Sequence, residues 1–283
     1  MAETPEIIPL STDNISDFHM HCDYSIDATG TIEEYCQAAL KRRLAEICFT
    51  SHFDANPRCD GEANFVRVNG KNLPTTVENV APYVEHVLKA AEEFYPYGLS
   101  VKLGLEVGWY AGCEEQVVKL KESYPFDYLL VGIHELNDEC FCARSTYEKC
   151  FSKFSREQAV ENYVQQVIAA AHTGLFDTVA HLDYIKKYGQ KFYGEGVNDD
   201  FRRLAPTIFA GLKSSGTSME VNTAARRLGF SSYYPAIDII NMARRAGVAV
   251  QFLGSDAHRP EHVGYEFEEV IPLVPDAVTH CED

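Results

Sequence analysis

The sequence predicts an α/β protein in which parallel strands close into one barrel, and three observations support that class. The chain has 283 residues, of which 46% are hydrophobic, which is enough for one large core. Short apolar runs alternate with helical patterns, as in repeated βα units. Residues of metal-ligating types follow those runs, and barrels of this class carry their active sites at the carboxyl ends of the strands. We therefore expect a single domain over residues 1–283.

The predicted elements follow one another along the whole chain. Seven strands are predicted, at about 17–21, 46–51, 101–106, 128–133, 178–181, 218–222 and 248–254. Six helical patterns are predicted, at 31–44, 76–95, 113–122, 155–173, 199–213 and 235–246. Capping boxes open the first helix, with Thr31 and Glu34, and the fourth, with Ser155 and Gln158, and Gly247 ends the last. Seven strands with intervening helices predict a barrel.

Residues 53–75 are predicted to form a long polar loop after the second strand. In a barrel this loop lies over the active-site face, because it follows the carboxyl end of a strand. It is a candidate lid or specificity loop, and an ordinary surface excursion is the alternative.

Composition excludes several classes of partner. The net charge of −17 disfavours nucleic-acid binding, which needs Lys and Arg to neutralise phosphates. No apolar run approaches the length of a membrane span, and the first residues, MAETPEIIPLSTDN, do not resemble a signal peptide. We expect a cytoplasmic protein with a small-molecule partner, and the sequence does not predict an oligomeric state.

The nine cysteines give no disulfide framework or zinc ribbon, because their number is odd and no CxxC pair occurs. Reduced thiols in a reducing compartment are the simplest interpretation. A metal or redox site at Cys140 and Cys142 is the alternative.

Nine residues of metal-ligating types fall at or after the ends of predicted strands. They are His19, His21, Asp27, His52, Glu106, His134, His181, Asp256 and His258. Imidazoles and carboxylates at this density suit divalent transition metals, and more than one ion. This pattern predicts metal-assisted hydrolysis, of a phosphate ester in the first instance.

Two short motifs carry most of this prediction. His19 and His21 stand at i and i+2 on the first strand, so both side chains point to the same side. Asp256 and His258 repeat the spacing on the last strand, which adjoins the first in a closed barrel. Glu106 ends an apolar strand, where a buried carboxylate is costly unless it is paired. For His52, His134 or His181 taken singly, a hydrogen-bonded core histidine is the alternative.

The motifs HMH, TSH, GLE, VGIH, AHLD and GSDAH, in this order, resemble those of the polymerase-and-histidinol-phosphatase (PHP) superfamily. AHLDYIKKYG and EVNTAARR are similar to the monofunctional histidinol-phosphate phosphatases within it. The resemblance implies a distorted (β/α)7 barrel with a trinuclear centre of zinc, manganese or iron. It also implies one metal shell of His19, His21, Glu106 and Asp256, with Glu106 bridging to a second ion held by His52 or His134. Asp27, His181 and His258 complete the remaining shells.

Two positions depart from that family pattern. Asp27 stands where histidinol phosphatases often have a histidine, and Ser51 stands where many superfamily members have an aspartate. Neither change removes an obligatory ligand, although Asp27 changes the expected affinity and metal preference.

Candidate phosphate contacts follow the sixth strand. Arg226 and Arg227 are expected on the active-site face, and Arg227 best matches the arginine that the family places after its Glu-x-Asn motif. A solvated helix start is the alternative for both. Arg144 is a further candidate, and Asp183 is expected to orient a histidine or to bind a cationic substrate group. Glu220 and Asn222 share one strand face and are expected to hold a ligand or an arginine in place.

The hypothesis from the sequence is in-line attack on phosphorus by a metal-bridged hydroxide, with Asp256 and His258 as the catalytic residues acting through that hydroxide. L-Histidinol phosphate is the expected substrate, and histidinol and phosphate are the products. The alternatives are another phosphoesterase of this fold, acting on nucleotides or phosphotyrosine, and a non-catalytic metal-binding regulatory domain.

Overall fold

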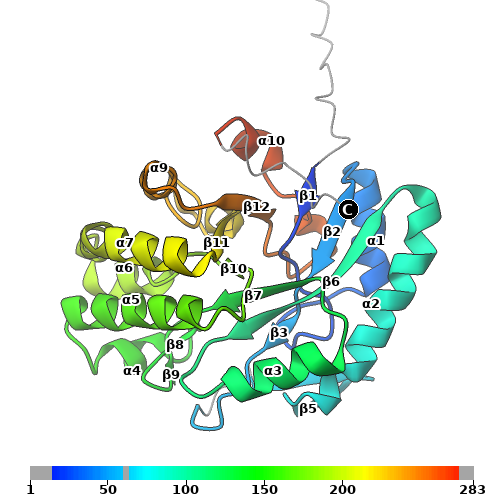
Figure 1. Ribbon diagram of the computed structural model, residues 1–283, viewed down its shortest axis with the longest axis horizontal. Coiled ribbons are helices and arrows are strands. Elements are labelled where there is room, and N and C mark those ends of the chain that lie inside the picture. Colours follow the sequence, from blue (N-terminus) through cyan, green and yellow to red (C-terminus); the bar gives the residue numbers. More distant parts are fainter. Residues whose placement is uncertain (1–14, 60–63, 274–283) are drawn as a thin grey trace, which may run out of the picture.

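The computed structural model describes residues 15–59 and 64–273, so the N-terminal segment considered above lies outside the described part. Within this part, seven parallel strands form one curved sheet (Figure 1). In spatial order they are β1 (Ser16–Asp17), β2 (Glu46–Phe49), β6 (Ser100–Gly108), β7 (Tyr128–Gly132), β10 (Thr178–Val179), β11 (Ser218–Asn222) and β12 (Val250–Gly254). The short β3 (His52–Phe53) continues β2 and pairs with β6. The predicted seven-stranded parallel barrel is confirmed.

Backbone hydrogen bonds between the first and last strand regions nearly close the barrel. The N–H of Phe18 donates to the carbonyl of Leu253 over 2.9 Å, and the N–H of Asp256 donates to the carbonyl of His19 over 2.7 Å. Regular strand geometry nevertheless ends at Asp17, earlier than the prediction of 17–21. The predicted strand 178–181 also stops early, because His181 has a positive φ of 28°.

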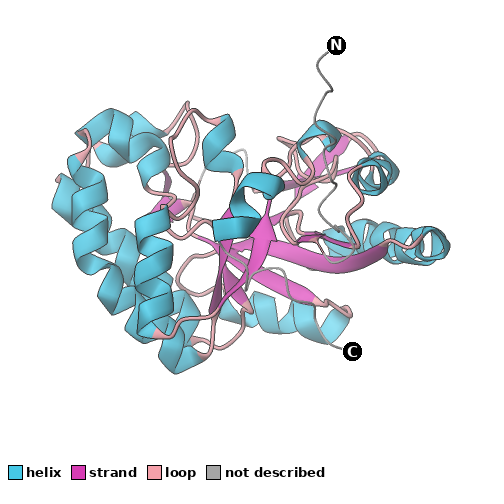
Figure 2. Cartoon of the chain, turned by 90° about the horizontal axis from the view of Figure 1, so that it is seen from above, coloured by secondary structure: helices cyan, strands magenta, loops and turns pink. Residues whose placement is uncertain are grey.

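Helices cover the outside of the strands (Figure 2). The six predicted helices correspond to α1 (Ile32–Lys41), α2 (Ala81–Phe94), α3 (Glu114–Ser123), α5 (Arg156–His172), α7 (Gly196–Ser215) and α9 (Ile237–Ala246). Both predicted capping boxes are present, at Thr31 and at Ser155. Four short helices were missed because they are too short to show a period: α4 (Tyr147–Phe151), α6 (Lys186–Tyr193), α8 (Ala224–Arg227) and α10 (Phe267–Val270). Among the helices of residues 15–59 and 64–273, none combines the length and the apolar character that a membrane span requires.

The segment predicted as a polar loop, 53–75, contains an antiparallel hairpin of β4 (Phe65–Val68) and β5 (Lys71–Pro74). Asn69 and Gly70 both have positive φ, as a two-residue Asn-Gly hairpin turn requires. The guanidinium of Arg67 on β4 donates to the carbonyls of Asp23, Ile26 and Ala28. The hairpin therefore fixes the backbone on both sides of Asp27. Residues 60–63 of this segment lie outside the described part.

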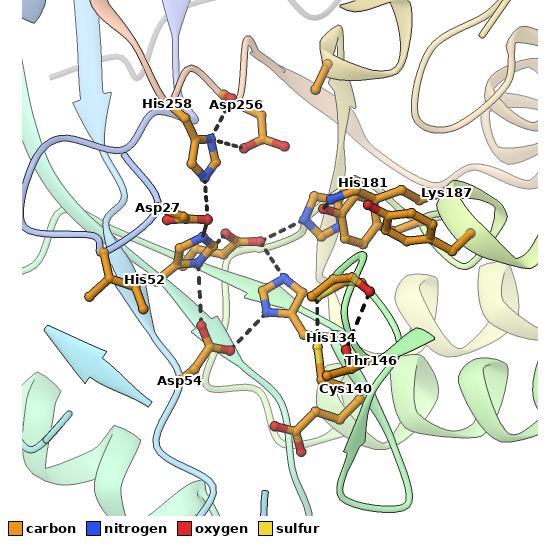
Figure 3. Close-up of a pocket in the computed structure, with 18 of the residues that line it drawn as sticks. Asp27, His52, Asp54, His134, Cys140, Thr146, His181, Lys187, Asp256 and His258 are labelled. Carbon is orange, nitrogen blue, oxygen red and sulfur yellow. Dashed lines mark hydrogen bonds and ion pairs between the residues drawn. The ribbon is translucent and has the colours of Figure 1, made fainter. Parts of the chain in front are cut away.

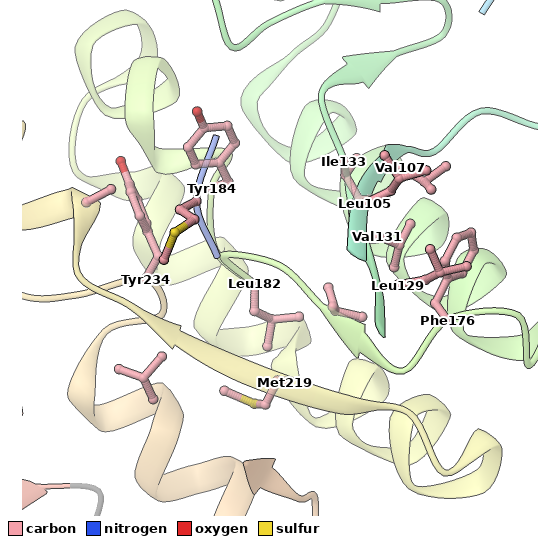
Figure 4. Packing of buried hydrophobic residues seen from close by; sticks show 14 of the residues in the cluster. Leu105, Val107, Leu129, Val131, Ile133, Phe176, Leu182, Tyr184, Met219 and Tyr234 are labelled. Carbon is pink, nitrogen blue, oxygen red and sulfur yellow. The ribbon is translucent and has the colours of Figure 1, made fainter. Parts of the chain in front are cut away.

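Two groups of apolar side chains support the site from different sides. The larger packs between the strands and the helices, and includes Leu105, Val107, Leu129 and Val131 of β6 and β7 (Figure 4). The smaller fills the barrel interior, where Phe18 stacks on Phe252 with ring centroids 4.7 Å apart. A filled interior leaves the carboxyl ends of the strands as the mouth of the barrel, as is usual for this architecture.

Candidate metal centre

The residues predicted as ligands converge at the mouth of the barrel. A cavity of about 610 Å³ is lined by seven of them: Asp27, His52, Glu106, His134, His181, Asp256 and His258. His19 and His21 are fully buried beside Glu106 and Asp256. Eight of the nine lie at or near strand ends, whereas Asp27 comes from the loop before α1. The structure thus brings all nine together.

The innermost donor group contains His19, His21, Glu106 and Asp256. The Nε2 atoms of His19 and His21 lie 3.1 Å apart, and each lies 3.3–3.6 Å from Glu106 Oε2 and from Asp256 Oδ1. Four donors about 2.0–2.2 Å from a tetrahedral ion lie about 3.3–3.6 Å from one another. The four imidazole–carboxylate distances fall in this range and the two imidazole nitrogens lie slightly closer, so these donors can share one ion.

Glu106 also faces a second group with its other oxygen. Oε1 lies 2.8 Å from His181 Nε2 and 3.2 Å from His134 Nε2. Gly132 makes this approach possible, because a Cβ there would lie 2.5 Å from His134 Nε2 and 2.6 Å from Glu106 Oε1. The two oxygens of one buried carboxylate thus serve two sets of imidazoles.

A third group, of Asp27, His52 and His258, is more exposed than the first two (Figure 3). The Asp27 Oδ2 atom lies 3.2 Å from His258 Nε2 and 3.7 Å from His52 Nε2. The ring of His21 stacks on those of His52 and His258, with centroids 4.1 and 4.3 Å away, and the latter two rings lie 5.6 Å apart. His52 Nδ1 also lies 3.1 Å from Glu106 Oε2, so this group adjoins the innermost one.

Carboxylates outside the cluster orient its imidazoles. Glu220 on β11 meets His19 Nδ1 with both oxygens, at 3.0 and 3.1 Å, and accepts the backbone N–H of His181. Asp54 lies 2.9 Å from His134 Nδ1. Carboxylate–histidine pairs of this kind fix the tautomer and direction of metal-ligating imidazoles.

Asp54 is the orienting residue that sequence reasoning missed. The available signal was its place two residues after His52 in SHFD, which puts both side chains on one side of a strand. Glu220, in contrast, was expected to hold a ligand, and its hydrogen bonds to His19 agree with that expectation.

The donor chemistry fits bound cations. Because Nδ1 of His19 and of His134 faces a carboxylate, it carries the proton of the neutral ring, and Nε2 presents a lone pair. In the neutral rings these lone pairs face the oxygens of Glu106 at 3.3 and 3.2 Å, so either a proton or a metal ion has to lie between them. A divalent ion at each position would satisfy this requirement.

The electrostatics of the cluster show the same demand for positive charge. Burial alone would raise the pKa of Glu106, but the imidazoles of His19, His134 and His181 hold it well below its ordinary value. Burial alone would lower the pKa of His134, but Asp54 and Glu106 raise it to about 10. Without metal, protons on the imidazoles partly neutralise the buried carboxylates.

Arg227 is the predicted phosphate contact that reaches the cavity. Its Nη2 donates to the carbonyl of Asp256 over 2.8 Å, while its buried Nη1 has no hydrogen-bond partner. Burial lowers the pKa of Arg227 from its ordinary value. An arginine of this kind remains charged, so Arg227 brings a positive charge and one unpaired N–H donor to the wall of the cavity.

The other three predicted substrate contacts do not line the cavity. Arg226 points away, with its Nε donating to Glu266 over 2.9 Å. Asp183 is buried against Lys186, whose Nζ donates to it over 2.7 Å, so the cation that it binds belongs to the chain itself. Arg144 is exposed to solvent.

Lys187 lines the cavity although sequence reasoning passed over it. Its Nζ donates to the hydroxyl of Tyr184 over 2.6 Å, and the Tyr184 ring stacks on His181 with centroids 3.9 Å apart. Among the described residues, Lys187 and Arg227 are the lysine and arginine side chains in the cavity wall. The only sequence signal was its place in AHLDYIKKYG, six residues after His181.

A nearly closed parallel barrel with clustered imidazoles and carboxylates at its mouth defines a metallohydrolase class. The PHP domain model matches residues 17–224, so the chain belongs to the PHP domain family. A protein of Deinococcus radiodurans described as "Probable histidinol-phosphatase" is 30% identical over 264 residues, 93% of each chain. The histidinol-phosphatase of Bacillus subtilis is 23% identical, over 89% of this chain and 96% of that one.

A solved structure shares the fold over nearly the full length. It is the histidinol phosphate phosphatase of Lactococcus lactis, complexed with zinc, L-histidinol and phosphate. The TM-score is 0.71 at 20% identity, with 94% of this chain and 95% of that chain covered. This likeness agrees with the predicted distorted (β/α)7 barrel.

Proposed function

We propose that this protein is a metal-dependent phosphatase that hydrolyses L-histidinol phosphate to L-histidinol and phosphate in histidine biosynthesis, in the cytoplasm. The observation that carries the proposal is Glu106, whose two oxygens each face a separate set of imidazoles in a cavity that Arg227 also enters. The histidinol-phosphatases found as relatives cover nearly the whole chain, which supports the choice of substrate.

Three ion positions account for the nine ligands. His19, His21, Glu106 and Asp256 would hold the first ion. Glu106 with His134 and His181 would hold the second, and Asp27 with His52 and His258 the third. Donor sets of imidazole and carboxylate suit zinc, manganese or iron.

Bound divalent ions would supply Lewis acidity and an activated water to phosphate ester hydrolysis. The chain itself supplies the means to hold the substrate phosphate. Arg227 offers Nη1 as a charged donor, and Lys187 offers a second positive charge on the cavity wall. We assign Asp256 and His258, which line the cavity with Asp256 Oδ1 3.4 Å from His258 Nδ1, to the side from which water attacks.

The leaving group requires a different environment, because histidinol carries an amine and an imidazole. Glu135 lines the same cavity, and its carboxylate is held by the amide of Asn56. We assign it to the cationic amine. Tyr184 and Tyr188 supply aromatic wall for the imidazole ring.

The direct test is phosphate release from L-histidinol phosphate after chelation and after manganese or zinc is added back. A nucleoside monophosphate and an aryl phosphate serve as comparison substrates. We expect release that requires metal and strongly favours histidinol phosphate. Metal-dependent release that favours a comparison substrate would move the function elsewhere among phosphomonoesterases. No release from any substrate by metal-loaded protein would indicate a non-catalytic domain.

A further inference from the structure

Two cysteines in the cavity wall have no part in the proposed hydrolysis. Cys140 ends β9 (Glu139–Cys140), and its Sγ lies 3.5 Å from that of Cys142. Both thiols line the cavity and are partly exposed, whereas the other described cysteines are buried. Figure 3 shows Cys140 beside Thr146 on the His134 side of the cavity. A close, accessible dithiol therefore lies next to the metal centre.

We propose that Cys140 and Cys142 form a reversible thiol–disulfide modification site for a peroxide, with Cys140 as the attacking thiolate and Cys142 as the resolving thiol. The Cys140 thiolate attacks one peroxide oxygen and the O–O bond breaks. Hydroxide departs, and Cys140 becomes a sulfenic acid. The deprotonated Cys142 sulfur then displaces hydroxide and forms the S–S bond. In total, two thiols are oxidised to one disulfide, and hydrogen peroxide is reduced to two waters.

The two sulfurs have different roles because their surroundings differ. A hydrogen bond from the Cys142 thiol lowers the pKa of Cys140 to about 5, with further help from Thr146 and the backbone N–H groups of Cys142 and Ala143. Either sulfur can donate in this pair, but Thr146 and two backbone N–H groups already donate to Cys140, which makes Cys142 the donor and raises its pKa well above its ordinary value. At neutral pH, Cys140 is therefore the nucleophile and Cys142 the proton carrier.

Other ionisable groups around the pair come from several elements. Lys187 of α6, Asp54 after β3 and Tyr184 before α6 act on Cys142. Cys150 of α4 faces Cys140. Lys187 lowers the pKa of Cys142, which helps this thiol to ionise once the Cys140 thiolate has been consumed.

The geometry favours a labile disulfide over a soft-metal site. The sulfurs must approach from 3.5 Å to about 2.05 Å across one intervening residue, which strains a short ring. Strained and exposed disulfides have oxidising potentials and are readily reduced. Over residues 15–59 and 64–273, neither cysteine belongs to any group of three metal-ligating side chains.

Oxidation of the pair has a direct route to the metal centre through Phe141, which lies between the two cysteines. Its backbone N–H donates to the carbonyl of His134 over 3.1 Å. Its buried ring packs against Tyr184, which stacks on His181. Drawing Cys140 and Cys142 together displaces Phe141, so we expect weaker metal binding and slower turnover. The effect on turnover rests on the proposed phosphatase function, whereas the thiol chemistry does not.

The chemistry is tested by adding hydrogen peroxide to the metal-loaded protein at about pH 6, alkylating the remaining thiols and digesting with trypsin. The peptide 122–144 contains Cys140 and Cys142 and no other cysteine. We expect it to lose two hydrogens as a disulfide. Cys59, which lines the same cavity and is recovered in peptide 59–67, is the internal comparison. Cys140 should be oxidised roughly tenfold faster than free cysteine under the same conditions, after correction for the lower nucleophilicity of an acidic thiolate.

Variants separate the two roles. Cys142→Ser should stop at a sulfenic acid on residue 140 that dimedone traps, Cys140→Ser should give neither product, and Cys150→Ser should behave as the unaltered protein. The proposal is overturned if Cys59 reacts as fast as Cys140, or if Cys140 pairs with a cysteine other than Cys142. We expect full oxidation to lower turnover of histidinol phosphate about tenfold, with recovery after reduction and metal addition. Unchanged turnover in the oxidised protein would overturn the route through Phe141, while the peptide masses still test the chemistry if the phosphatase proposal fails.

Discussion

The two neighbouring arginines after β11 allow a sharp test of how the site binds phosphate. Arg227 enters the cavity with an unpartnered Nη1, whereas Arg226 is turned to Glu266 and lies outside it. Replacing either arginine by methionine removes one positive charge and shortens the side chain by the same amount in both variants. Any difference between the two variants therefore reports the direction of the side chain and not the net charge.

The expected loss follows from the contacts. A hydrogen bond to a charged group contributes about 1.5–3 kcal/mol. Because about 1.36 kcal/mol corresponds to a tenfold change in rate, Arg227→Met should lower kcat/KM by roughly 10- to 150-fold through Nη1 alone. The lost Nη2 bond to the Asp256 carbonyl should add to this loss. Arg226→Met removes a partly exposed ion pair and should leave kcat/KM within about twofold.

The assay is phosphate release from L-histidinol phosphate by metal-loaded protein, with metal content measured for each variant. Arg227→Lys restores the charge without the planar fork, so partial rescue is expected. Equal losses in the two methionine variants would refute the reasoning, because they would indicate a long-range charge effect. Full activity in Arg227→Met would remove Arg227 from the site.

Three further predictions concern the metal centre. Asp54→Asn removes the carboxylate that faces His134 Nδ1, and we expect metal affinity to fall about 10- to 100-fold in competition with a chelator. Unchanged affinity would argue against this orienting role. Gly132→Ala places a Cβ 2.5 Å from His134 Nε2 and should abolish binding of the ion between His134 and Glu106, as elemental analysis would show. Gly211→Ala, whose Cβ meets nothing closer than 3.5 Å, should retain full metal content. In metal-free protein the raised pKa of His134, about 10, gives stability that is complete below its ordinary value of about 6.5 and is lost as the pH rises through the folded value. Thermal unfolding of chelated protein should therefore shift to lower temperature between those pH values, and a flat profile would contradict the assignment.

Sequence alone predicted the parts of the site where the chain stays paired across the closure of the barrel. His19 and His21 follow β1, and the bridge between Met20 and Ala257 keeps this segment beside the segment after β12, so both histidines face Asp256 as expected. Glu106 was expected as a buried bridging carboxylate, and its two oxygens do face two sets of imidazoles. Which imidazole shares its second oxygen was open in the sequence, and the distances favour His134 together with His181.

Predictions failed where the backbone leaves strand geometry. Asp183 stands two residues after His181, but the positive φ of His181 breaks the alternation and turns Asp183 to Lys186. The choice between Arg226 and Arg227 depends on the single helical turn of α8. Successive side chains on a helix point about 100° apart, so only the fixed start of that turn decides which one enters the cavity.

Asp27 shows how a ligand can be predicted correctly while the reason for its position stays hidden in the sequence. It belongs to no strand, and its side chain is 55% exposed, so burial alone does not hold it beside His258. The constraint comes from a remote element, because Arg67 of the β4–β5 hairpin binds three carbonyls around Asp27. Those contacts join residues about 40 positions apart, so a local hydrophobic pattern cannot predict them. The segment 53–75, predicted as a loop above the site, thus holds the backbone around Asp27 and so positions the third ligand group.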